Sequence, residues 1–364
     1  MTYNTFAGNV TGIISEFRHQ IDRIGGQSME IYTIRDVARM AGVAVSTVSR
    51  VLNGRPDVSE ETRRRVMDVV EECGFVQNRN ARNLKNTKTV FSAIIVRGRH
   101  NTFLSDVAEQ MLACAQEYKT PFIVKYIDEE DDEFDAMRQL YTEKRAGSFI
   151  LLGSRLDERK EMIRMLGVPC VFATVDASGS GLERASSVSI DDRAATRAMM
   201  DRLIEQGHTH VAVFGGCREG DDVFARRYRG AMDSLNEHGI SFDSDQYVQS
   251  RFTLHGAYES AMRFFEKHRD VTAVLAMSDT MAAGIIRALA DMGMHVPTDV
   301  SVTGFDGTEM AGYYIPAITT VRQPTATIAR ESVALLCDML DGGDARHITV
   351  DYTLVDGESI GPVK

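Results

Sequence analysis

The chain has 364 residues, of which 43% are hydrophobic and 26% are charged, and its formal net charge is −11. This is the composition of a water-soluble globular protein, and apolar runs no longer than a strand exclude a membrane-spanning helix. The start of the chain lacks the basic and apolar segments of a secretory signal, and its five cysteines are scattered. We therefore expect a cytoplasmic protein with reduced thiols, without a disulfide framework or a zinc site.

Residues 1–29 form an extension that fits neither of the patterns found further along the chain. Apolar residues recur there at roughly helical spacing, which would suit a short amphipathic helix. Translation from Met29, directly before the first motif, is the alternative. Both interpretations stay open.

Residues 30–76 have the pattern of three compact helices. Apolar residues follow the spacing of one buried face over 34–41, and Gly42 then suits a sharp turn. A second helix is expected over 45–52. The third begins at Ser59, an N-cap residue followed by two glutamates that favour the positive end of the helix dipole.

The second helix is the candidate DNA-reading element. Its outward residues are small or polar: Val45, Ser46, Thr47, Ser49 and Arg50. A helix behind a tight turn fits the major groove, where small side chains permit close approach and an arginine reaches a guanine edge or a phosphate. From spacing alone, a plain three-helix bundle with a polar second helix remains the alternative. The local charge favours DNA, because residues 30–89 carry eleven Lys/Arg against eight Asp/Glu.

Residues 77–89 are a candidate hinge. Arg79, Arg82, Lys85 and Lys88 recur every three residues, so a helix would align them as a basic stripe with Leu84 among them. An exposed leucine on a basic helix suits a wedge in the minor groove, where cations hold the phosphates on either side. A flexible polar linker whose leucine docks on a neighbouring domain is the alternative.

From residue 90 to residue 364, β-rich runs alternate with amphipathic stretches, which predicts parallel sheets covered by helices on both faces. So long an alternation exceeds one sheet and favours two α/β lobes with a ligand cleft between them. The expected strands are Phe91–Val96, Phe122–Ile127, Ser148–Leu152, Pro169–Thr174, Val211–Gly215, Thr272–Met277 and Ser301–Phe305. The expected helices include Asp106–Tyr118, Arg193–Gln206 and Thr280–Met292.

The run from Thr33 to Gly54, TIRDVARMAGVAVSTVSRVLNG, closely resembles the DNA-binding head of the lactose-repressor/galactose-repressor family. The resemblance implies that Val45 and Ser46 are the main variable base-reading positions and that Arg50 reads a base. It also implies phosphate contacts from Thr33, Asn53 and Ser59. Ala44 departs from the serine that commonly caps the recognition helix in this family, which removes a cap contribution of about 1 kcal/mol.

The segment ARNLK at 81–85 resembles the hinge helix of the same family, which folds only when two chains meet on the operator. The resemblance favours the minor-groove wedge and implies DNA contacts from Arg82, Leu84 and Lys85. Ordering this segment only on cognate DNA would make the hinge a switch.

The resemblance extends over residues 89–361, where the family has a periplasmic-binding-protein-like sensor. The matching segments are GVP at 167–169, SDTMA at 278–282, VSVTGFD at 300–306 and TTVRQP at 319–324. The implied ligand contacts are Arg227, Ser278, Asp306 and Gln323, with Phe103 as a pocket wall. Thr174 stands where relatives often carry a ligand-binding aspartate, which leaves the identity of the effector open, and Asp279 is either a helix cap or a ligand contact.

No other pattern supports an enzyme, a metal site or a cofactor. Asp128–Glu133 is interpreted as a solvated loop and a helix start, His208 and His210 lack the further ligands that zinc needs, and Gly215–Gly220 lacks the Gly-Lys-Ser/Thr ending of a phosphate loop.

The sequence therefore predicts a homodimeric transcriptional regulator, more often a repressor than an activator, that binds a pseudo-palindromic operator. A small polar effector, a sugar or a sugar phosphate, is expected to close the cleft. A solute-binding protein and a sugar-modifying enzyme are the rivals: the first needs export, and the second would turn over a sugar.

Overall fold

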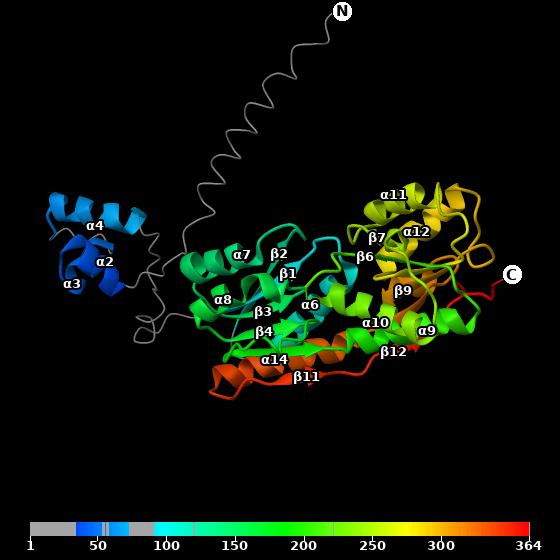
Figure 1. The fold of residues 1–364 in the computed structure, drawn as a ribbon. Coiled ribbons are helices and arrows are strands. Elements are labelled where there is room, and N and C mark those ends of the chain that lie inside the picture. The colour runs from blue at the N-terminus through cyan, green and yellow to red at the C-terminus, as the bar shows by residue number, and fades with distance from the viewer. Residues whose placement is uncertain are drawn as a thin grey trace, which may run out of the picture. The chain divides into compact units, whose positions relative to one another are not determined.

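A computed structural model of the chain describes residues 34–52, 55, 58–72, 91–118, 121–220 and 222–363 (Figure 1). These residues fall into two compact units, one within residues 1–81 and the other within residues 82–364. In the described ranges, every helix is too short or too polar to cross a lipid bilayer.

The smaller unit has the three predicted helices, α2 (Ile34–Ala41), α3 (Val45–Leu52) and α4 (Glu60–Glu72). Gly42 has a φ of +65°, the left-handed conformation that the turn between α2 and α3 requires. The Ser59 hydroxyl accepts a hydrogen bond from the Thr62 backbone N–H at 3.3 Å, as expected of the cap before α4. The small core consists of Val37, Ala38, Ala41, Val48, Val51, Val66 and Val69.

The larger unit begins with the N-terminal lobe, a six-stranded sheet in the order β11-β5-β4-β3-β1-β2 in which all neighbours are parallel. Its strands are β1 (Phe91–Arg97), β2 (Phe122–Ile127), β3 (Ala146–Leu152), β4 (Cys170–Ala173), β5 (Ala185–Ser189) and β11 (His347–Thr349). Its helices are α6 (Thr102–Ala115), α7 (Glu133–Gln139), the π-helix η1 (Leu140–Lys144), α8 (Leu156–Leu166) and α14 (Thr325–Leu340). Figure 1 shows α14, from late in the chain, lying with the early strands of this lobe.

The C-terminal lobe has a second six-stranded sheet in the order β12-β10-β9-β8-β6-β7, parallel except where β12 runs antiparallel to β10. Its strands are β6 (Val211–Gly215), β7 (Tyr247–Gln249), β8 (Ala273–Ala276), β9 (Ser301–Asp306), β10 (Thr319–Arg322) and β12 (Thr353–Val355). Its helices are α9 (Asp192–Glu205), α10 (Val223–Glu237), the short 3-10 helix η2 (Ser244–Gln246), α11 (Leu254–Phe265), α12 (Asp279–Asp291) and α13 (Glu309–Tyr313).

Both sheets are buried on two faces, as the continuous apolar runs predict. In β1, Ile94 and Val96 belong to one core cluster while Ala93 and Ile95 belong to another on the opposite face. The fold class expected from the alternation of strands and helices is therefore confirmed.

The boundaries differ from the prediction in two ways. Helix α6 begins at Thr102 and not at Asp106, because the Asn101 side chain accepts from the Leu104 backbone N–H and caps the helix one turn earlier. Several sheet strands were not predicted, among them β5 and the three-residue strands β7, β11 and β12. Polar residues dominate β5, and strands of three residues are too short to display an alternating pattern.

The backbone passes between the two lobes three times. It leaves the N-terminal lobe between β5 and α9, returns between β10 and α14, and leaves again between β11 and β12. The three connections are short and run side by side, because Thr349 of β11 pairs with Ser189 of β5 and Thr353 of β12 pairs with Arg322 of β10.

Candidate functional site

A cavity of about 430 Å³ lies between the two lobes. Residues that follow the carboxyl ends of the parallel strands line it from both sides, which is where open α/β sheets bind ligands. The N-terminal lobe contributes residues after β1, β2, β3 and β4, and the C-terminal lobe contributes residues after β6 and β7 together with the ends of β9 and β10. Of the five residues that the family resemblance implies for the ligand, Phe103, Arg227, Asp306 and Gln323 line this cavity.

Arg227, on the first turns of α10, is the buried cation of the cavity floor. Its Nε donates to the Asp192 carboxylate at 2.7 Å, and one terminal nitrogen donates to the Met277 carbonyl at 2.6 Å. The guanidinium carbon lies 3.5 Å from the centroid of the Phe305 ring, a cation–π contact. These contacts fix the orientation of the guanidinium before any ligand arrives.

Asp306 ends β9 on the same floor and is not part of a loop after the strand. Its φ of +109° lies in the region that disfavours side chains, so the strand end aims the carboxyl at a cost in backbone strain. The Gln323 side-chain amide donates to this carboxyl at 2.9 Å. Burial raises the pKa of Asp306 well above its usual value, an effect that Arg227 opposes and Asp279 reinforces.

Ser278 and Asp279 are placed differently from the other implied contacts. The Ser278 hydroxyl accepts from the Met281 backbone N–H at 3.1 Å and caps α12, and Ser278 is absent from the cavity lining. Asp279 is fully buried and is neither cap nor lining residue: its carboxylate accepts from the Thr308 backbone N–H at 2.7 Å and from the Thr320 hydroxyl at 2.6 Å. It therefore ties α12 to the segments that follow β9 and that form β10.

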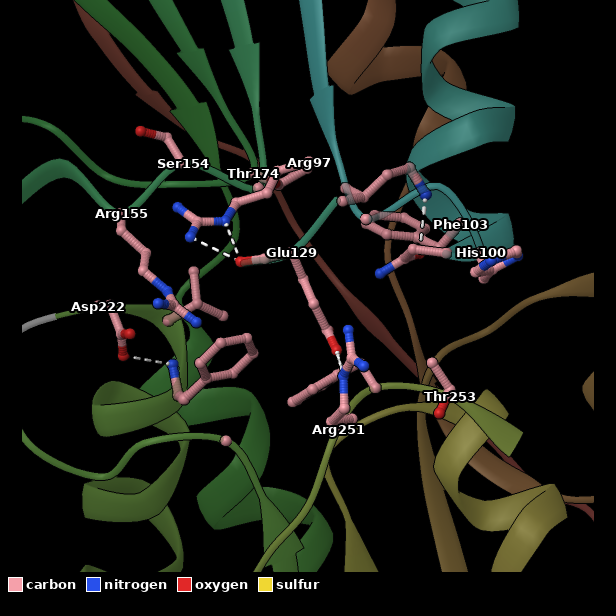
Figure 2. A pocket seen from close by; sticks show the side chains of 18 of the residues that line it. Arg97, His100, Phe103, Glu129, Ser154, Arg155, Thr174, Asp222, Arg251 and Thr253 are labelled. Atoms are coloured by element: carbon pink, nitrogen blue, oxygen red, sulfur yellow. Dashed lines mark hydrogen bonds and ion pairs between the residues drawn. The ribbon is translucent and has the colours of Figure 1, made fainter. Parts of the chain in front are cut away.

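An ion pair crosses the rim of the cavity from one lobe to the other. Arg251, after β7, donates through Nε to the Glu129 carboxylate at 2.6 Å and through a terminal nitrogen to Asp128 at 3.1 Å. Figure 2 shows Glu129 and Arg251 meeting from opposite sides, while Arg97 donates two hydrogen bonds to the Glu129 carbonyl. The segment Asp128–Glu133 is a loop and a helix start, as predicted, but Asp128, Glu129 and Glu130 also line the cavity. Glu133, the first residue of α7, is only 2% exposed.

A second ion pair joins the lobes beside the cavity. Arg226 of α10 donates to the Asp176 carboxylate at 2.8 Å, and Asp176 follows β4 in the N-terminal lobe. The side chains are 26% and 33% exposed, so solvent screens this pair only in part. The lobes are thus held together by charged contacts at two separate places.

Aromatic side chains from both lobes form apolar parts of the cavity wall. Phe103 on α6 comes from the N-terminal lobe, and Phe224 packs against Phe252 in the C-terminal lobe with ring centroids 4.4 Å apart. Figure 2 places Arg155 and Thr174 on the N-terminal side of the same cavity. Such a wall suits a ligand with a ring: the aromatic side chains can cover an apolar face of the ring, and the polar groups nearby can bind its hydroxyls.

His208 and the glycine-rich segment after β6 both have structural roles. His208 is buried, and its ring contacts the hydroxyls of Thr272 at 3.0 Å and Ser301 at 2.9 Å. Its Nε2 also lies 3.0 Å from the Gly361 carbonyl, which ties the sheet to the C-terminal segment. The glycine-rich segment after β6 contributes Gly216 and Cys217 to the cavity. Among the described residues, no cluster of three His, Cys, Asp or Glu side chains could hold a metal ion.

Helix α3 of the smaller unit presents the residues expected to read DNA. Val45 is 42% exposed, Ser46 and Arg50 are also exposed, and Ser49 is half-buried. Val48 and Val51 face the core on the opposite side of the helix. Of the other predicted DNA contacts, Ser59 is exposed, whereas Thr33, Asn53, Arg82, Leu84 and Lys85 lie outside the described residues.

Sequence reasoning missed the cavity residues Arg97, Glu129, Arg155 and Arg251, and it missed Asp192, which holds Arg227 from outside the lining. A general signal existed for some of them, because Arg97 and Glu129 stand at or just beyond the ends of predicted strands. Arg251 had no such signal, since the strand that precedes it is only three residues long.

Each of the two units matches a known protein family. The pattern described as "Bacterial regulatory proteins, lacI family" matches residues 33–78, and that of a "Periplasmic binding protein-like domain" matches residues 200–360. The chain is 33% identical over 336 residues to the HTH-type transcriptional regulator MalR of Clostridium butyricum, covering 90% of this chain and 98% of that protein. It is 31% identical over 324 residues to the catabolite control protein A of Priestia megaterium, covering 89% and 95%.

Solved structures give the same picture. The transcriptional regulator CelR in complex with cellobiose matches with a TM-score of 0.68 and 28% identity, over 90% of this chain and 99% of that one. A lac repressor dimer bound to operator and the anti-inducer ONPF matches with a TM-score of 0.64 over 91% and 99%, and at 23% identity this second likeness concerns the fold alone.

Proposed function

This chain belongs to the lacI family of bacterial regulatory proteins and is a DNA-binding transcriptional regulator with an effector-binding domain, and we propose that it is a homodimeric repressor whose operator affinity is set by a saccharide held between its lobes. The family consists of transcriptional regulators and not of enzymes. The observation that carries the proposal is the cavity that both lobes line, with Arg227, Asp306 and Gln323 on its floor.

The chemistry of the cavity supports a polyhydroxylated ligand. Asp306 and Gln323 offer donors and acceptors suited to hydroxyl groups, and the phenylalanine rings cover apolar ring faces. The cellobiose complex of a relative with 28% identity supports the same class of ligand. The proposed ligand residues are Phe103, Arg227, Asp306 and Gln323, and Ser278 would act indirectly by capping α12.

The DNA side of the proposal rests on α3 and the hinge segment. The major-groove contacts to bases or phosphates would come from Val45, Ser46, Ser49 and Arg50. Contacts to the phosphates of the DNA backbone would come from Thr33, Asn53 and Ser59. Arg82, Leu84 and Lys85 would order in the minor groove when two chains meet on a pseudo-palindromic operator. We propose domain boundaries of 30–76 for the DNA-binding domain, 77–89 for the hinge and 90–364 for the effector-binding domain, after an extension over 1–29.

Effector and DNA would be coupled through the lobes. A ligand that changes the angle between the lobes also changes the spacing of the two hinge origins in a dimer, and hence the cost of ordering the hinges. Because such coupling is reciprocal, operator DNA must change effector affinity by the same factor.

The test is a thermal-shift screen of neutral saccharides, including cellobiose, and of sugar phosphates, including glucose 6-phosphate. It is run with and without an operator that a genome-wide pull-down at physiological salt has identified. A saccharide that raises the unfolding temperature and alters operator affinity supports the proposal. Binding of DNA without any sequence preference, or no response to either class of sugar, contradicts it.

A further inference from the structure

Arg227 lies between two buried carboxylates that belong to different elements. Its Nε is 2.7 Å from Asp192, the first residue of α9, and a terminal nitrogen is 3.9 Å from Asp306, the last residue of β9. All three side chains are at most 7% exposed. The arginine thus has a close hydrogen-bonded partner on one side and a second carboxylate just beyond hydrogen-bond distance on the other.

The two carboxylates have different relations to the cavity. Asp306 and Arg227 line it, whereas Asp192 does not. Asp192 therefore reaches the ligand site only through the guanidinium that it holds. A buried guanidinium needs a hydrogen-bonded counter-charge, and breaking a buried pair by removing one partner is costly because it leaves the other charge uncompensated.

We propose that Asp192 is a positioning residue that keeps the Arg227 guanidinium from closing on Asp306. Held by Asp192, Arg227 leaves the Asp306 carboxyl to Gln323 and to the cavity. Without Asp192, the nearest replacement is Asp306, and the closed pair would withdraw both groups from the ligand.

This arrangement also selects the ligand group at the floor. A ligand hydroxyl can donate to Asp306 and accept from Arg227 at the same time. An ionised phosphate or carboxylate has no hydrogen to donate, so its oxygens would repel the oxygens of the Asp306 carboxyl. This step rests on the proposed function, but the positioning of Arg227 does not, and it can be tested without a ligand.

The test compares the full-length chain with its Asp192→Asn variant, which keeps the shape of the side chain and removes the charge. Crystal structures should show the distance from Arg227 to Asp306 falling from 3.9 Å to hydrogen-bond length. The Asp306 carboxyl carbon, followed by NMR with ¹³C-labelled aspartate and assigned with Asp306→Asn, should titrate at a lower pH than in the unmodified chain. The groups that face Asp306 are Arg227, Asp192, Asp279 and Gln323, and the substitution alters only the first two.

Asp191→Asn is the matched control. Asp191 precedes Asp192 and caps α9 through the Ala194 backbone N–H at 2.9 Å, a role that asparagine also performs. It should leave both the distance and the titration unchanged. Asp192→Glu, which restores a carboxylate, should keep Arg227 apart from Asp306 and serves as the informative variant if Asp192→Asn does not fold.

An unchanged distance from Arg227 to Asp306 in Asp192→Asn would overturn the proposal even if Asp306 titrates lower, because loss of the Asp192 charge alone lowers that pKa. Closure on Asp306 in Asp192→Glu would overturn it as well. A thermal-shift screen in which no saccharide binds the unmodified chain would instead contradict the proposed function alone.

Discussion

Arg251 Nε lies 2.6 Å from the Glu129 carboxylate, and this contact joins the two lobes across the rim of the cavity (Figure 2). Arg251 is 56% exposed and Glu129 is 21% exposed, so solvent partly screens the pair and the contact is weak. A contact of this strength biases the lobes toward closure without locking them.

Arg251→Gln is therefore expected to raise the opening equilibrium of the lobes by less than about fivefold. Amide hydrogen exchange in the segment 128–132 should become faster, and added salt should accelerate exchange in the unmodified chain but hardly in the variant. Arg287→Gln is the control, because Arg287 pairs with Asp291 within one helix. Equal effects of the two substitutions would contradict the role of Arg251.

Asp306→Asn is expected to abolish the response to the effector and to leave operator affinity within about twofold. Asparagine tolerates a positive φ better than alanine and can still contact Gln323, so the substitution tests the carboxyl and not the backbone. Thermal shift with the saccharide panel measures the first effect, and a gel-shift titration measures the second. Asp356→Asn, on the surface of the same lobe, is the control. A normal response in Asp306→Asn would refute the assignment of the floor.

Gly230→Ala is expected to destabilise the larger unit by about 1–3 kcal/mol. A Cβ at this position would overlap the Arg193 backbone carbonyl, because α10 packs closely against α9 there. Thermal denaturation should show a lower unfolding temperature. Gly312→Ala in α13 meets no atom within 4 Å and should change the stability little. Similar losses from both substitutions would mean that the close helix contact is not the cause.

Stability is expected to fall as the pH rises toward 6, in part through Asp279. Burial raises the pKa of Asp279 to about 6, from an ordinary value of 3.8. The folded chain therefore holds this proton more tightly than the unfolded chain, and the stabilisation present below about pH 3.8 is lost as the pH rises through about 6.

Asp279→Asn removes this titration. The slope of unfolding temperature against pH between 4 and 6 should become flatter, although not flat, because burial also raises the pKa of Asp306. Thermal melts in a series of buffers measure the slope. A slope identical to that of the unmodified chain would exclude Asp279 as a source of the pH dependence.

Leu84→Ala is expected to weaken binding to the cognate operator far more than binding to unrelated DNA. Leu84 lies outside the described residues, and the expectation rests on the basic spacing around it and on the resemblance to a hinge helix. Fluorescence anisotropy with both DNAs at the same salt concentration measures the two affinities. Equal losses would remove the argument for a minor-groove wedge.

The sequence predicted the elements with strong local patterns and much of the cavity floor. Strands β2 and β6 have the predicted bounds. Arg227, Asp306 and Gln323, which the family resemblance implies as ligand contacts, all line the cavity. The rim could not be predicted. Arg251 and Glu129 are 122 residues apart, and nothing local marks either as the partner of the other. Pairing of this kind arises only when two lobes meet, which periodicity does not record.

The three backbone connections between the lobes restrict how one lobe can move relative to the other. Because the three links run side by side, the lobes can rotate about them but cannot separate. A protease cut in any single link would leave two fragments that migrate together until a denaturant is added. A ligand in the cavity can therefore change the angle between the lobes only by a rotation about these three links.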